Sequence, residues 1–366
     1  MKTAQILEDI LPKIATHPGI LIADELDSRE DLNQKELAHL LDVKVSFLNE
    51  IIKGKRPVTA DTALLLEKAL GIPADFWLKF QVQYDLDTAR IKQKNISKVQ
   101  NIEMWSIIKN YVPVSIFKKL GYLTDDIEKN IQKIFEIFKV ETVDDFITQF
   151  AVRKFSFYRK SQKLTVDEKN LFSWSALAEY EASNLPVNNF DKNVQSKLIE
   201  ELNQCFFENK NVLEKIKTIL QNHGIKLIVL EKFNKTPVDG YSFWSENNPA
   251  IVLSMRYKRV DNLAFTLFHE LGHVFLHLSQ NKDFKFLDID DKESTVYEKE
   301  ADGFARNHLI SESIWAKIEV YKFPCKDDLV NELAQEYQIH PSIIFGRMCF
   351  ENENYKVFTK IKREIE

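Results

Sequence analysis

Apolar residues recur at helical spacing through most of this chain. Residues 130–140, for example, place isoleucine and phenylalanine three or four positions apart, which predicts a helix with one buried face. Glycine destabilises helices and occurs only 9 times in 366 residues. The hydrophobic pattern therefore predicts a mainly helical protein.

A different pattern lies between residues 225 and 255. Three short runs rich in β-branched and aromatic residues, IKLIVLE, GYSFW and AIVLSM, are separated by turn sequences that contain Asn, Pro and Gly. These runs predict three strands in one small antiparallel β-sheet. The expected fold class is therefore mainly α with a small sheet, an α+β arrangement.

Two polar stretches, at residues 91–100 and 185–193, interrupt the periodic segments and suggest domain boundaries. A chain of 366 residues is long enough for two or three domains that each bury a core. We expect four regions along the chain: an N-terminal module of five helices (1–90), a helical connector (91–185), a mixed α+β domain (186–312) and a C-terminal helical extension (313–366).

Composition and charge narrow the class of protein. The chain is 44% hydrophobic and 29% charged, values typical of globular proteins and unlike those of disordered or collagen-like chains. Its formal net charge of -5 argues against a protein that coats nucleic acid along its whole surface. Any contact with DNA must therefore come from a local basic patch.

The sequence also bears on the compartment. Its three cysteines are widely spaced and form no CxxC pair, which favours a reducing environment. The first residues carry Glu8, Asp9 and Lys13 among their apolar positions, unlike a secretion signal. The apolar segment 263–278 contains Glu270 and three histidines, so it is a poor membrane span. We expect a cytoplasmic protein with no membrane partner.

Four or five short helices are predicted between residues 17 and 87, and a tight connection at 41–43 joins two of them into a helix-turn-helix. The outward face of the second helix carries hydrogen-bonding groups, and Gly54 ends that helix as a left-handed cap. Asparagine can bond an adenine edge in the major groove, and compact positive clusters bind phosphates. The candidate DNA-contacting residues are Gln34, Ser46, Asn49, Lys53, Lys55 and Arg56.

Taken alone, these positions also suit the solvated face of an ordinary helical domain. However, residues 33–77 and the Tyr-Asp-Leu at 84–86 resemble the Cro/C1-type (XRE) DNA-binding domain, and GKRPVTADTALLLEKALG and PADFW are similar to HigA-type antitoxins. The resemblance implies a homodimer that binds double-stranded DNA at a palindromic operator, with a toxin as protein partner. Glu50 would repel phosphate, or it would accept a hydrogen bond from a cytosine amino group. The exact operator sequence therefore cannot be predicted.

Residues 268–273 read FHELGH and contain an HExxH motif inside a helix predicted at 260–278. His269 and His273 lie one turn apart on the same helix face, so both imidazoles can bind one Zn²⁺ ion. Glu270 projects beside them. It is the expected general base, which takes a proton from the attacking water and passes it to the leaving amine of a cleaved peptide.

A catalytic zinc site usually has a third protein ligand, which a second helix must supply. The helix predicted at 297–309 presents Glu298 as that ligand, and two alanines on the same face allow close packing. Asp302, one turn later, is expected to hold a ligand histidine by its second ring nitrogen. Glu300 is the second choice of ligand because it points about 200° away from Glu298. We expect His277 to cap or pack.

The C-terminal half resembles the ImmA/IrrE family of zinc metallopeptidases, which relieve repression by cleaving partner regulators. The resemblance runs from about residue 213 to residue 310 and rests on NHGIKLIVL, AIVLS, LAFTLFHELGHVFLHL and EKEADGFARNHLI. It implies a gluzincin-like domain in which His269, His273 and Glu298 bind zinc and Glu270 is catalytic.

Two functions are consistent with these patterns. The first is a transcriptional regulator that joins an XRE domain to a zinc-dependent endopeptidase, which cleaves a partner regulator or toxin-related protein. The second is a non-enzymatic HigA-type antitoxin and autorepressor, whose metallopeptidase-like domain serves toxin binding or structure. Every candidate ligand is present in both cases, so the sequence leaves this choice open.

Overall fold

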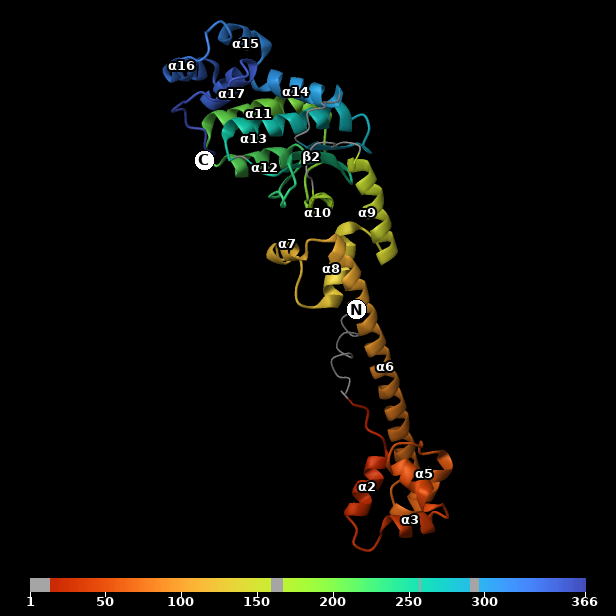
Figure 1. The fold of residues 1–366 in the computed structure, drawn as a ribbon. Helices are drawn as coiled ribbons and strands as arrows, with labels where there is room; N and C mark the ends of the chain where they lie inside the picture. The colour runs from red at the N-terminus through yellow and green to blue at the C-terminus, as the bar shows by residue number, and fades with distance from the viewer. Residues whose placement is uncertain (1–13, 159–166, 257, 290–295) are drawn as a thin grey trace. The chain divides into compact units, whose positions relative to one another are not determined.

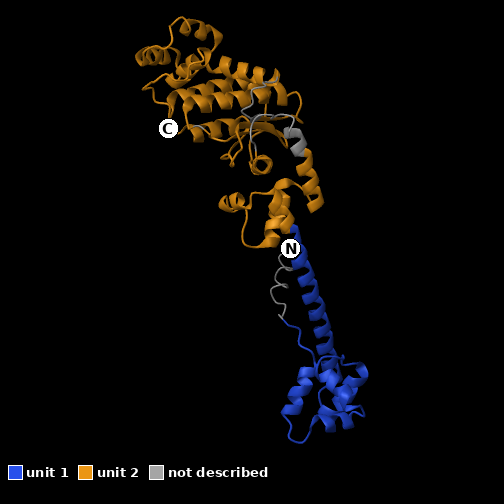
Figure 2. Ribbon diagram, in the orientation of Figure 1, with its two compact units in different colours: residues 1–104 blue, residues 105–366 orange. Residues whose placement is uncertain are grey.

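The computed structural model describes residues 14–158, 167–256, 258–289 and 296–366. The chain divides into two compact units, Met1–Met104 and Trp105–Glu366 (Figure 2). The polar stretch 91–100, expected as a boundary, lies inside one continuous helix, α6, which spans Ala74–Tyr111. The four regions proposed from the sequence stay predictions.

The first unit is built from short helices around a small apolar core. Leu37 and Ala38 on α3 and Leu48 and Ile51 on α4 are fully buried, as the helical spacing predicts, and they pack with Trp77. Asn33 and Glu36 form a reciprocal capping box that fixes the start of α3. The helices are α2 (Gly19–Asp27), α3 (Gln34–Leu40), α4 (Val45–Ile52), α5 (Ala60–Leu70) and α6.

The second unit contains helices before, within and after its sheet. The amphipathic helix expected at 130–140 is α8, with one face buried. The helices are α7 (Val114–Lys119), α8 (Ile127–Phe138), α9 (Val143–Tyr158), α10 (Glu168–Asn184), α11 (Gln195–Glu208), α12 (Val212–Asn222), α13 (Val260–Gly272), α14 (Val296–Leu309), α15 (Glu312–Ile318), α16 (Asp327–Tyr337) and α17 (Pro341–Glu351), with a short 3₁₀ turn at Lys192–Val194.

The sheet contains the three expected strands, β1 (Lys226–Val229), β2 (Val238–Ser245) and β3 (Asn248–Leu253), and a fourth, β4 (Lys285–Ile289). The strand order is β1-β3-β2-β4. β2 pairs antiparallel with β3 and β4, but β1 runs parallel to β3, so the expectation of a purely antiparallel sheet is wrong. The segment between β1 and β2 is long enough to carry β2 past β3. As a result β3 pairs with β2 on one edge and with β1, in parallel, on the other.

Helix α13 is the centre of this unit. It contacts β2 and β3 on one side and α14 and α17 on others, and Figure 1 shows α11, α13 and α14 side by side. Gly272 allows α14 to approach closely, because a Cβ there would lie 2.9 Å from the Cα of Ala301. The mainly helical α+β fold is thus confirmed, and the two alanines predicted to permit close packing, Ala301 and Ala305, are fully buried.

The C-terminal helices pack into the same core as α13. Val330 and Leu333 on α16 and Ile344 and Phe345 on α17 are buried in one apolar cluster with Leu267 of α13. They therefore serve as packing elements of this unit. In the described part of the chain, no helix is long and apolar enough to span a bilayer.

Candidate metal centre and helix-turn-helix surface

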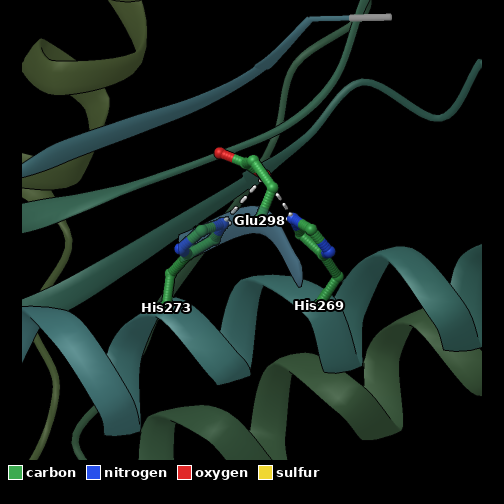
Figure 3. Close-up of side chains that lie close together, drawn as sticks. All are labelled: His269, His273 and Glu298. Carbon is green, nitrogen blue, oxygen red and sulfur yellow. Dashed lines mark hydrogen bonds and ion pairs between the residues drawn. The ribbon is translucent and has the colours of Figure 1, made fainter. Parts of the chain in front are cut away.

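Two histidines project from the same face of α13 near its end. His269 lies within the helix and His273 directly follows its last residue, so the i, i+4 spacing brings both rings to one side (Figure 3). The two residues are only 4% and 1% exposed. The apolar residues between and beside these histidines are buried and anchor this helix in the core.

Glu298 reaches the two histidines from α14. Its carboxylate lies 3.1 Å from Nε2 of His269 and 3.4 Å from Nε2 of His273, and the two Nε2 atoms are 3.1 Å apart. The three ligand atoms all lie within 4.8 Å of one another. Two imidazole nitrogens and one carboxylate oxygen at this spacing suit a zinc site that keeps one position open.

Each histidine is held through its other ring nitrogen. Nδ1 of His269 lies 2.9 Å from the carboxylate of Asp302, as the sequence predicts. Nδ1 of His273 lies 3.0 Å from Nδ1 of His277, whose Nε2 lies 3.0 Å from the carboxylate of Glu300. Because a carboxylate only accepts, Nδ1–H of His269 and Nε2–H of His277 must be donors. His273 then donates Nδ1–H to His277, which leaves both Nε2 atoms free to bind a metal.

His273 and His277 also lie four residues apart, within a π-helical turn, His273–Leu278, that continues α13. The sequence predicts that His277 caps or packs and makes Glu300 the second choice of ligand. His277 does pack, against the rings of Phe286 and Tyr297. It also forms a hydrogen-bonded pair with Glu300 behind His273, which the sequence did not predict. Single π-helical turns inside α-helices often mark functional sites.

Burial and hydrogen bonding set the protonation of this cluster. Burial lowers the pKa of His273 to about 4, although the nearby Glu298 carboxylate acts in the opposite direction. Burial alone would raise the pKa of Glu298, but the adjacent His269 and His273 outweigh burial and lower that pKa well below its usual value. A neutral imidazole and an ionised carboxylate are the forms that bind a cation.

Glu270, the expected general base, is fully buried beside His269. Its side chain lies against the backbone of Gly240 in β2, where an added Cβ would stand 2.0 Å from Oε1 and 2.8 Å from Cγ of the glutamate. Sequence analysis did not single out Gly240, although a glycine inside a strand often marks a close approach. The sheet therefore fixes the position of this carboxylate.

The first unit presents the expected DNA-contacting residues on and around α4. Ser46 is exposed and Asn49 is half-buried on that helix. Lys53 lies just beyond the last helical residue, and Gly54 takes the predicted left-handed conformation with φ of 67°. Lys55 and Arg56 are exposed in the turn that follows, and Gln34 is the first residue of α3.

Glu50 and Arg56 form an ion pair on this surface, and the Arg56 guanidinium lies 5.2 Å from the centre of the Phe47 ring. The sequence leaves open whether Glu50 repels phosphate or accepts from a cytosine amino group, and it does not reveal this pairing. In this pair the charge of Arg56 offsets the charge of Glu50. Lys53 and Lys55 are exposed and have no such acidic partner among the described residues.

Two family models match the chain in separate regions. The helix-turn-helix model matches residues 25–77, and the model of the IrrE N-terminal-like domain, in the M78 peptidase family, matches residues 220–344. The chain joins an XRE-type helix-turn-helix domain to an IrrE/ImmA-like domain of the M78 peptidase family. Both resemblances drawn from the sequence are thereby confirmed.

Relatives of known name align with the helix-turn-helix region. Virulence-associated protein I of Dichelobacter nodosus is 39% identical over 83 residues, which cover 23% of this chain and 77% of that protein. A solved HigA-family addiction module antidote protein from Coxiella burnetii is 36% identical, covering 23% of this chain and 94% of that one, with a TM-score of 0.22. The Pseudomonas aeruginosa antitoxin HigA, solved with the higBA promoter, is 32% identical over 22% of this chain and 90% of that one, with a TM-score of 0.21.

The IrrE-like match extends from the end of α12 into α17. It includes all four strands, the HExxH helix α13 and the Glu298 helix α14. The outer partners of the candidate metal ligands, Asp302 and the His277–Glu300 pair, also lie within it. The whole candidate metal centre therefore belongs to the IrrE-like domain.

Proposed function

We propose that this protein is a cytoplasmic, antitoxin-like transcriptional regulator whose IrrE-like domain binds one Zn²⁺ ion and cleaves a partner regulator or toxin-related protein. The observation that carries the proposal is the convergence of His269, His273 and Glu298 within 4.8 Å, each histidine being oriented by its own outer partner. The membership in the M78 peptidase family supports the same chemistry.

His269, His273 and Glu298 would hold the ion. When bound, Zn²⁺ would polarise the scissile carbonyl and a water molecule as a Lewis acid. Asp302 and the His277–Glu300 pair hold the two imidazole rings so that both Nε2 atoms face the same point. This orientation exists without further rearrangement of the side chains, which favours tight metal binding.

Glu270 would act as the general base. Its carboxylate accepts a proton from the attacking water and then delivers that proton to the leaving amine of the cleaved peptide bond. The packing against Gly240 limits its movement, because the side chain is fully buried and the backbone of β2 lies directly against it. A fixed base reduces the cost of reaching the reactive geometry.

The helix-turn-helix domain would bring the protein to DNA. Its homodimer would bind a palindromic operator, with α4 in the major groove of each half-site. Asn49 and Ser46 would contact base edges, and Gln34, Lys53, Lys55 and Arg56 would contact phosphates. The exposure of the basic residues after α4 supports this role, since the rest of the chain carries a net negative charge.

The proposal is tested by incubating the zinc-loaded, full-length protein with the product of the neighbouring gene. We expect cleavage of that partner, and loss of cleavage in the Glu270→Gln variant, which keeps the metal ligands. A partner that binds but stays intact with both proteins would contradict the peptidase proposal. It would support the non-enzymatic alternative, an antitoxin whose metallopeptidase-like domain serves toxin binding.

A further inference from the structure

A cavity of about 360 Å³ lies in the second unit, separate from the three candidate metal ligands. Its walls come from the start of α13, the C-terminal half of α14, the helix α17 and the segment that follows α17. Its volume falls in the range of natural small-molecule sites. The elements around it share one apolar core, so the cavity is part of the folded unit.

Four arginines line this cavity, against two aspartates. Asp261 is already engaged by Arg259, and Asp302 is engaged by His269. Arg347 pairs with Glu351 at 3.6 Å and donates to the carbonyl of Ile310 at 2.7 Å. Among the described residues, neither of the two remaining arginines forms a salt bridge with these acids.

Those two arginines are Arg306 and Arg363. Each guanidinium lies over an aromatic ring, that of Arg306 at 5.8 Å from the centre of Phe350 and that of Arg363 at 4.6 Å from the centre of Phe345. Nε of Arg363 is buried and has no hydrogen-bond partner among the described residues. A buried guanidinium nitrogen without an acceptor is costly, so an acceptor in the cavity would stabilise it.

The other walls of the cavity are largely apolar. Phe265, Leu309, Ile343 and Tyr355 face it together with Phe350. Such walls suit the body of an organic ligand, while guanidinium groups pair with the planar oxygens of carboxylate or with phosphate. A purely inorganic anion would leave these apolar walls uncovered.

From this juxtaposition we propose that the cavity binds a small organic oxyanion, a carboxylate or phosphate monoester carried on an apolar body. Arg306 and Arg363 pair with the oxyanion, and the aromatic and aliphatic walls cover the apolar part. The proposal goes beyond the proposed function, because the site needs neither the metal nor DNA. The cavity touches the metal centre through two lining residues, Asp302, which contacts His269, and Phe265, whose ring lies 6.3 Å from the ring of His269.

The test is calorimetric titration of the full-length protein with two probes, 4-phenylbutyrate and phenyl phosphate. We expect one probe molecule to bind per chain, and the tighter of the two identifies the oxyanion. The uncharged 4-phenyl-1-butanol and inorganic phosphate should each bind at least about tenfold more weakly, because each lacks half of the recognised chemistry. Binding of neither charged probe, or equal binding of the alcohol, would overturn the proposal.

Variants and a chelator locate the binding. Arg306→Met keeps the aliphatic stem and should weaken the better probe at least about tenfold. Arg363→Met provides a second, independent loss, and Lys299→Met on the exposed face of α14 is the matched control that should bind normally. Equal affinity in Arg306→Met, Arg363→Met and the control would place the probe elsewhere. Binding of the probe must also persist in EDTA, since loss of binding in EDTA would mean that the probe coordinates a metal. Probe binding does not depend on peptidase activity, so this proposal and the proposed function can fail separately.

Discussion

The metal centre and the helix-turn-helix surface place their candidate residues in opposite environments. His269, His273 and Glu270 are almost completely buried, and named neighbours hold each of them in place. Ser46 and Lys55 are exposed, and their roles depend on a partner that would contact them from outside. Contacts within the protein therefore support the candidate metal centre, whereas the role of the exposed surface must be tested with DNA.

If neighbours fix the metal centre, removing an outer partner should weaken metal binding without removing a ligand. His277→Phe keeps the aromatic packing against Phe286 but removes the acceptor for His273. We expect Zn²⁺ affinity to fall by about 10- to 100-fold, measured by competition with a chromophoric chelator. The exposed Lys299→Gln variant is the control, and unchanged affinity in His277→Phe would show that His273 needs no such support.

The position of Glu270 offers a second way to test the buried centre. Gly240→Ala should destabilise the protein by about 1 to 3 kcal/mol, because the new methyl group would overlap the buried carboxylate and the Cγ of Glu270. Gly303→Ala on α14 is the matched control, since an added Cβ there meets nothing within 4 Å. Urea denaturation measures both changes, and equal stability of the two variants would contradict this packing.

Much of the metal centre could be predicted because it depends on local spacing. The HExxH pattern and the alanine face beside Glu298 are properties of two helices. The His277–Glu300 pair could not be predicted, since it joins the turn after α13 to α14 and depends on how these two segments pack. The same holds for β4 and for the parallel pairing of β1 with β3, which depend on contacts between distant segments.

On the exposed surface, Asn49 and Lys55 should differ in what they contribute. Asn49→Ala should cost about 1 to 3 kcal/mol at one position of each half-site and relax the base preference there. Lys55→Ala should weaken binding to all sequences and reduce the salt dependence by about one counterion. Titrations of the protein with its own promoter and with random DNA distinguish these two effects. Equal losses of affinity on both DNAs for Asn49→Ala would mean that Asn49 contacts the DNA backbone and no base.

The smallest effect is expected from the Glu50–Arg56 pair. Glu50→Gln removes the counter-charge of Arg56, so binding to any DNA should tighten slightly and the salt dependence should rise by about one counterion. The same titrations over a series of salt concentrations measure this change. Weaker binding only to the promoter would instead mean that Glu50 contacts a base.

The most direct test of the metal centre is the zinc content of the purified full-length protein, measured by elemental analysis. We predict about one Zn²⁺ per chain in the wild type, none in His269→Ala, and about one in Glu270→Gln, because the first variant removes a ligand and the second does not. Full zinc occupancy in His269→Ala, or loss of zinc from Glu270→Gln, would contradict the assignment of His269, His273 and Glu298 as the ligands.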